Sequence, residues 1–224
     1  MTDRVPVSYE TLKDPLVLIV PGNTAEDSPQ WQQAWARQQA NCERLDLGMW
    51  HDPHRNTWVN KLNLAISRVN RPVVLVAQGL GNLAVAWWAE YERPAEGGPV
   101  VGALLVAPPD LDRPGLDQRV AKFGAVPRRA LPFPSFLVPD NYDPNGNYRS
   151  AYGLAKDWDA RFIDGEDEPG STTSTREWHF GQRLLNRLLR DYRLSPPVSR
   201  SKAPLGAPLS GGLTNNGAPA PVIV

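Results

Sequence analysis

The stretch from residue 73 to residue 88 constrains the fold of this chain more than any other part of the sequence. It begins with the apolar run 73–77, in which Val73, Val74 and Val76 favour a β-strand. A turn that contains Gly79 and Gly81 follows directly, and the chain then continues as an apolar segment with the length of a helix. A buried strand that passes through a sharp turn into a helix is typical of a parallel sheet covered by helices.

Short apolar runs and helical patterns alternate along the rest of the chain. The sequence predicts strands at 16–20, 42–47, 73–77, 100–107, 135–138 and 161–163. It predicts helices at 29–39, 57–69, 82–92, 148–158 and 177–192. This alternation predicts a single α/β domain with a mainly parallel sheet of five or six strands and helices on both faces. The stretch 109–134 is irregular and has room for one poorly defined helix.

Composition and charge exclude several classes of function. The 224 residues carry no net charge and no block of like charges, so neither nucleic acid nor an anionic membrane is an expected partner. The sequence shows no signal-peptide pattern and no apolar run near the ~18 residues that a membrane span needs. Cys42 is the only cysteine and cannot form an internal disulfide. We therefore expect a cytoplasmic protein.

The two ends of the chain differ in composition from its centre. Residues 1–14 form a polar lead-in, and residues 15–194 contain the predicted domain. In residues 195–224 Pro, Gly, Ser, Ala and Asn dominate, and large apolar side chains are few. Such a segment cannot bury enough apolar surface to offset its conformational entropy, so we expect a disordered tail.

Four segments, in the correct order, together resemble one protein family. They are Val20-Pro21-Gly22 with Ser28-Pro29-Gln30-Trp31-Gln32, Trp50-His51-Asp52-Pro53 with Trp58-Val59-Asn60-Lys61-Leu62, Ala77-Gln78-Gly79-Leu80-Gly81, and Pro134-Ser135 with Asn141-Tyr142-Asp143-Pro144. The pattern resembles the small, lidless serine hydrolases that include retinoblastoma-binding protein nine and bacterial YdeN-type proteins. The resemblance covers about residues 15–190 and implies an α/β-hydrolase fold.

The resemblance implies a degenerate catalytic triad. In the family a serine, an aspartate and a histidine act together, and the serine stands at the tip of a small-x-Ser-x-Gly elbow between a strand and a helix. Gly79 occupies the serine position here, whereas Asp143 keeps the acidic position. Pro169 stands near the histidine position, in a turn that contains no histidine. The nucleophile and the base are therefore both expected to be missing.

The rest of the expected site depends on backbone groups and on the pocket around the elbow. The N–H groups of Asn23 and Leu80 need no particular side chain to form an oxyanion-type site. The pocket is expected to be lined by Gln30, Trp31, Gln78 and Asn141.

The sequence thus predicts a catalytically inactive relative of serine hydrolases that binds a small carbonyl or anionic ligand, or a protein partner that the sequence does not identify. No cofactor is expected, and His51 and His54 around Asp52 are a weak pattern for a metal site. Two alternatives stay open. One is an active hydrolase with relocated residues, for example Asp143 with His179; the other is a structural subunit that builds a homo-oligomer.

Overall fold

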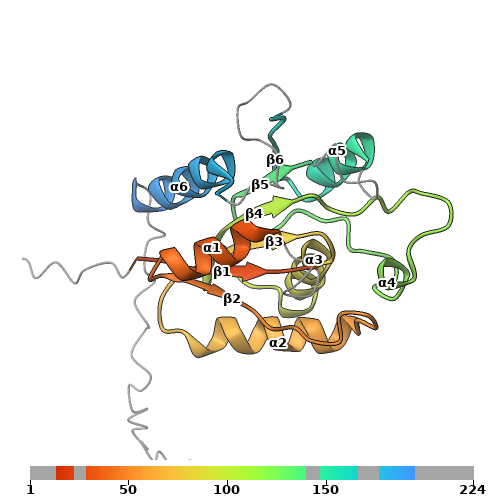
Figure 1. Cartoon of the computed structure of the whole chain (residues 1–224), viewed down its shortest axis with the longest axis horizontal. Coiled ribbons are helices and arrows are strands. Elements are labelled where there is room, and N and C mark those ends of the chain that lie inside the picture. The colour runs from red at the N-terminus through yellow and green to blue at the C-terminus, as the bar shows by residue number, and fades with distance from the viewer. Residues whose placement is uncertain (1–13, 23–28, 140–146, 166–176, 195–224) are drawn as a thin grey trace, which may run out of the picture.

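A single six-stranded sheet forms the centre of the molecule (Figure 1). The computed structural model describes residues 14–22, 29–139, 147–165 and 177–194. Within them the strand order is β2-β1-β3-β4-β5-β6, and every neighbouring pair is parallel. The predicted α/β architecture of one domain with a parallel sheet is confirmed.

The elements alternate along the chain as the sequence predicts. The strands are β1 (Leu16–Val20), β2 (Cys42–Arg44), β3 (Val73–Gln78), β4 (Val100–Val106), β5 (Ser135–Val138) and β6 (Arg161–Phe162). The helices are α1 (Gln30–Gln38), α2 (Arg55–Arg68), α3 (Leu80–Glu92), α4 (Gln118–Ala121), α5 (Tyr148–Asp157) and α6 (His179–Leu194).

The largest boundary error of the prediction concerns β2. It was expected over 42–47 but ends at Arg44, after which only the Leu45 N–H still reaches β1, at the Ile19 carbonyl (2.9 Å). The chain then turns away, because the Gly48 N–H bonds to the Asp46 carboxylate at 3.1 Å. Helix α3 begins two residues earlier than expected because the turn at Gly79 leads straight into it.

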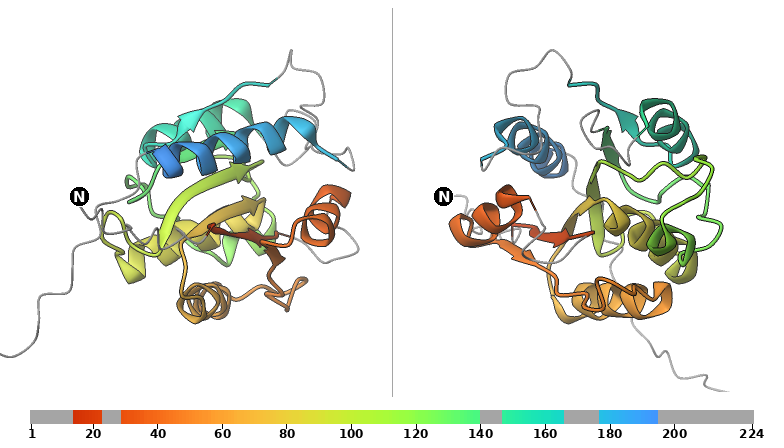
Figure 2. Two further views of the ribbon diagram at one scale, coloured as in Figure 1. Left: turned by 90° about the vertical axis from the view of Figure 1, so that its left-hand side faces the viewer. Right: turned by 45° about the vertical axis from the view of Figure 1, so that its right-hand side comes forward.

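Two hydrophobic cores, one on each face of the sheet, hold the helices in place. Along β1, Leu16, Leu18 and Val20 belong to the core that also contains residues of α2, α3 and α5. The intervening Val17 and Ile19 belong to the core that contains residues of α1 and α6. Figure 2 shows these two groups of helices on opposite sides of the sheet. This alternation is the period-two pattern of a strand that is buried on both faces.

Three buried tryptophans join α1 to the chain just before α6. The ring centroids of Trp31 and Trp35 lie 4.7 Å apart, and the ring of Trp178 lies 4.9 Å from the first and 5.8 Å from the second. The Trp35 indole N–H also donates to the Glu177 carbonyl at 3.3 Å. This tryptophan cluster connects segments that are more than 140 residues apart in the sequence.

The described residues contain no helix whose length and apolar character would allow it to cross a bilayer. The expected polar lead-in and the expected disordered tail fall almost entirely on residues 1–13 and 195–224, which lie outside the described residues.

Candidate functional site

The predicted elbow lies at the C-terminal edge of the sheet, between β3 and α3. Its tip, Gly79, has φ 52° and ψ −123°, and its N–H donates to the Val106 carbonyl at 3.1 Å. A positive φ costs a residue with a Cβ atom about 1–3 kcal/mol, whereas glycine adopts it without that clash. The chain thus makes the strained turn that a nucleophile elbow requires, with no side chain at its tip.

Backbone contacts hold the elbow tightly against the end of β1. A Cβ atom at Gly22 would lie 2.5 Å from the Gln78 carbonyl oxygen and 2.6 Å from the Leu80 nitrogen. A Cβ atom at Gly81 would lie 2.1 Å from the Val20 carbonyl oxygen. In both cases the neighbour is backbone, which cannot move aside as the end of a flexible side chain can.

We expect Gly81→Ala to destabilise the protein by about 2–3 kcal/mol, as overpacking of a rigid contact does. The added methyl group would force α3 and the end of β1 apart. Chemical unfolding followed by circular dichroism measures this loss. Gly153→Ala is a matched control, because a Cβ atom there meets nothing within 4 Å, and it should cost no stability. Equal stability of the two variants would contradict the close approach.

A chain of polar side chains borders the elbow on the α1 side. The Gln32 amide N–H donates to the Gln78 side-chain oxygen, and the Arg44 Nε–H donates to the Gln32 side-chain oxygen at 3.4 Å. Gln32 is 1% exposed, and burial lowers the pKa of Arg44 from its ordinary value. Gln78 lies on the same face of β3 as Val74 and Val76, which turns it toward α1. The sequence predicts Gln78 at this site, but no local pattern in it points to Gln32 or Arg44.

Asn82, in the first turn of α3, ties the elbow to β4. Its side-chain N–H₂ group donates to the Gly79 carbonyl at 3.0 Å and to the Val106 carbonyl at 2.8 Å. Asn82 is fully buried, and its side-chain oxygen meets no donor among the described residues. From the sequence, Asn82 is predicted only as part of a helix.

Of the expected oxyanion-type groups, the structure describes Leu80, the first residue of α3. The Gly79 N-cap cannot cap this helix with a side chain, so the positive end of the helix dipole lies at the elbow. Gln30 is exposed at the first residue of α1, whereas Trp31 is fully buried in the tryptophan cluster. The remaining expected site residues, Asn23, Asn141, Asp143 and Pro169, lie outside the described residues.

The described histidines and the cysteine have other surroundings. The His179 Nε2 lies 2.8 Å from the Glu177 carboxylate, and both side chains are exposed. His54 lies 3.7 Å from Asp52, also at the surface, and the described residues contain no cluster of acidic, histidine or cysteine side chains that could hold a metal. Burial raises the pKa of the Cys42 thiol to about 12, so this thiol is protonated and unreactive at neutral pH.

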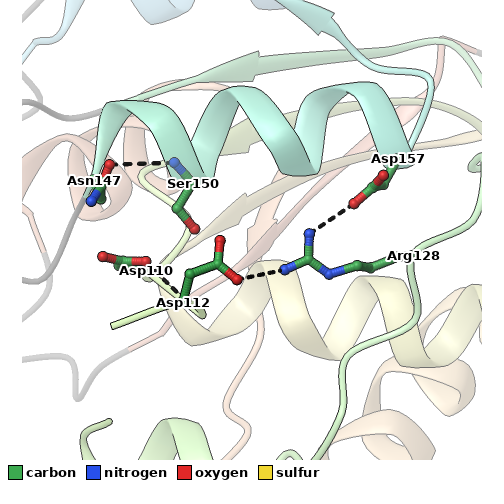
Figure 3. A network of polar contacts seen from close by, with 6 residues as sticks. All are labelled: Asp110, Asp112, Arg128, Asn147, Ser150 and Asp157. Carbon is green, nitrogen blue, oxygen red and sulfur yellow. Dashed lines mark hydrogen bonds and ion pairs between the residues drawn. The ribbon is translucent and has the colours of Figure 1, made fainter. Parts of the chain in front are cut away.

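A second polar network lies between the loop after β4 and helix α5 (Figure 3). Asp110 is 9% exposed and accepts the Asp112 N–H at 3.0 Å, and Arg128 bridges Asp112 and Asp157 at 3.1 and 2.8 Å. Asn147 caps α5, while the buried Ser150 hydroxyl finds no partner in the part of the chain that is described. None of these residues is predicted from the sequence to belong to a site. The ion pairs fix the irregular stretch before β5 against α5.

Comparison with known proteins places the chain among hydrolases. The family model described as "Serine hydrolase" matches residues 17–187. A putative YdeN-like hydrolase from Pectobacterium atrosepticum is 21% identical, with a TM-score of 0.63 over 80% of this chain and 92% of that one. The ydeN gene product from B. subtilis is 20% identical, with a TM-score of 0.60 over 79% and 99%. At these identities the structures show a shared fold. No curated protein matches the sequence.

Proposed function

Because this chain belongs to the serine hydrolase family, we propose that it is a catalytically silent member that binds a ligand at the elbow without forming an acyl-enzyme. One observation carries the proposal: Gly79 adopts the positive-φ turn at the tip of the strand–turn–helix and offers no side-chain oxygen. The chain belongs to the family and its turn resembles a nucleophile elbow, but Gly79 has no side-chain atom that could be acylated.

The chemistry of acyl transfer requires more than the fold. It needs an oxygen nucleophile, a base within hydrogen-bond distance and an acid that orients the base. Loss of the nucleophile and the base together costs about 10⁶-fold in kcat in a comparable triad, and what is left comes from the oxyanion site and from binding. Only binding at the elbow is therefore expected to survive.

The groups around the elbow favour an oxygen-bearing ligand. The Leu80 N–H stands at the positive end of α3, where carbonyl and carboxylate oxygens are stabilised. The Gln32 amide N–H already donates to the Gln78 side-chain oxygen. The group that Gln78 can offer to a ligand is therefore its amide N–H. We therefore propose a small carbonyl or carboxylate compound as the ligand.

A fluorophosphonate probe and short-chain p-nitrophenyl esters test the catalytic half of the proposal. The wild-type protein should show neither a covalent adduct in its intact mass nor ester turnover. Labelling or turnover that Asp143→Ala abolishes would instead support the active hydrolase with relocated residues. The binding half is tested with butyrate, which should shift the backbone amide resonance of Leu80 in a saturable manner. An unchanged resonance would contradict binding at the elbow.

Gly79→Ser should lower the melting temperature and restore no esterase activity. The new Cβ atom has room, because its nearest neighbour would be the Gly22 Cα at 3.9 Å, but φ stays positive. We expect a loss of about 1–3 kcal/mol, which at about 2–4 °C per kcal/mol is readily measured by calorimetry. Gly79→Ala is the control, since it carries the same strain without the hydroxyl. A stabilised serine variant would contradict the strain at Gly79. An active serine variant would contradict the absence of a base.

A further inference from the structure

A cavity of about 310 Å³ lies at the edge of the sheet opposite the elbow. Its walls come from the second half of α3, from the loop 127–132 before β5, and from Trp158 just before β6. Helix α3 starts at the elbow and spans 13 residues, so its far end is about 20 Å away from Gly79 at 1.5 Å per residue. The cavity is therefore separate from the proposed elbow site.

The walls of this cavity are apolar, and its rim is charged. Ala86, Ala89, Pro127, Leu131 and Trp158 supply small or rigid apolar surface. Trp158 is held by its indole N–H, which donates to the Pro127 carbonyl at 2.8 Å. A cavity of this kind is at the small end of ligand sites, which suits a body of about one aromatic ring.

Two arginines at the rim share one carboxylate. The Arg129 Nη1 lies 3.4 Å and the Arg93 Nη2 lies 3.9 Å from the same Glu90 oxygen. Both distances exceed those of a good charge-assisted hydrogen bond. The arginine side chains are 73% and 77% exposed, whereas Glu90 is 24% exposed. The three groups leave one net positive charge, and such exposed pairs hold the guanidinium groups weakly.

We propose that this cavity binds a small organic carboxylate with a short apolar body. The guanidinium groups of Arg93 and Arg129 can grip the carboxylate through two parallel N–H donors, a geometry that lysine cannot offer. The apolar body then lies against the alanine, proline and tryptophan walls. Glu90 competes with the ligand for both arginines and therefore lowers the affinity for the ligand.

The neighbouring Arg128 provides an internal comparison. It lies one residue before Arg129 but pairs with Asp112 and Asp157 at 3.1 and 2.8 Å, and it does not line the cavity. Of these adjacent arginines, Arg128 makes two structural ion pairs, whereas Arg129 lies at the rim of the cavity. A variant at Arg128 removes the same charge from the same loop at a residue that does not line the cavity.

The experiment is a calorimetric titration of the full chain with 4-phenylbutyrate and with its neutral analogue 4-phenylbutanamide. We expect saturable binding of the carboxylate, and about tenfold weaker binding of the amide, since loss of a charge-assisted contact is worth roughly this factor. Arg129→Gln should weaken carboxylate binding about tenfold, whereas Glu90→Gln should strengthen it by removing the competing carboxylate. Arg128→Gln should weaken binding less than Arg129→Gln does, because Arg128 holds the loop but does not line the cavity. The variant Arg44→Gln, near the elbow, should leave the affinity of this cavity unchanged.

Several outcomes would overturn this assignment. They are equal affinity for the acid and the amide, weaker binding by Glu90→Gln, or the same loss for Arg128→Gln as for Arg129→Gln. Inorganic phosphate that competes as well as phenylbutyrate would contradict a role of the apolar walls. Thermal melts of each variant separate a lost site from a lost fold, because Arg129 and Arg93 are exposed and their replacement should leave the melting temperature near that of the wild type.

Discussion

Replacing Asn82 by aspartate is expected to destabilise the protein strongly at neutral pH and only weakly in acid. Asn82 is fully buried and donates to the Gly79 and Val106 carbonyls at 3.0 and 2.8 Å. A carboxylate has no hydrogen to donate and would face both carbonyl oxygens, so the folded state raises the pKa of the introduced group. The ionisation penalty is then absent below the pKa of the unfolded chain and grows by about 1.4 kcal/mol per pH unit until the pH reaches the raised pKa of the folded state.

Between pH 4 and pH 7 this amounts to about 4 kcal/mol, a large part of the stability of an ordinary domain. Urea unfolding of Asn82→Asp at both pH values, relative to the wild type at the same pH, measures it. Asn82→Leu is the control, because it removes the two hydrogen bonds without adding a group that titrates. Its loss of stability should be the same at the two pH values. If the stability of the aspartate variant changed with pH as that of the wild type does, Asn82 would not bridge the two carbonyls.

Trp178→Ala is expected to cost about 3–5 kcal/mol, the usual loss for a buried tryptophan. Its ring is fully buried and lies 4.9 Å from the ring of Trp31 and 5.8 Å from that of Trp35, so its removal leaves a void in the contact between α1 and the start of α6. At about 2–4 °C per kcal/mol the melting temperature should fall by roughly 10 °C.

The denaturant midpoint, followed by circular dichroism, measures this loss. Trp50→Ala is the matched control. Trp50 is only partly buried and contacts Trp58 from the edge of the other core, with ring centroids 5.3 Å apart. Its removal should cost less than half as much. Equal losses would mean that the tryptophan cluster has no special weight in holding the two helices together.

The fold could be predicted closely where a strand is central and apolar. The limits of β1 and β5 agree with the predictions, because such runs are buried on both faces and are bounded by prolines or polar residues. The edge strands β2 and β6 end earlier than predicted. Each has one neighbour, so it lasts only as long as that neighbour supplies hydrogen bonds, and composition does not record this limit.

The candidate site was only partly predictable. The pattern around Gly79 located the elbow, because a glycine turn between two apolar runs is a local signal. The contact between Gln32 and Gln78 spans 46 residues and depends on how α1 lies on the sheet. The predicted helix 177–192 includes Trp178, whereas α6 begins at His179. Trp178 has a φ of 32°, which no local sequence pattern predicts.

Helix α3 connects the two regions to which we assign ligands, since Gly79 precedes its first residue and Arg93 follows its last. Its beginning is wedged against β1 at Gly81 and bonded to β4 through Asn82. These contacts prevent α3 from shifting along its own axis. We therefore expect the two proposed sites to be thermodynamically independent: a ligand at one end should leave the affinity of the other end unaltered, and the two binding free energies should add.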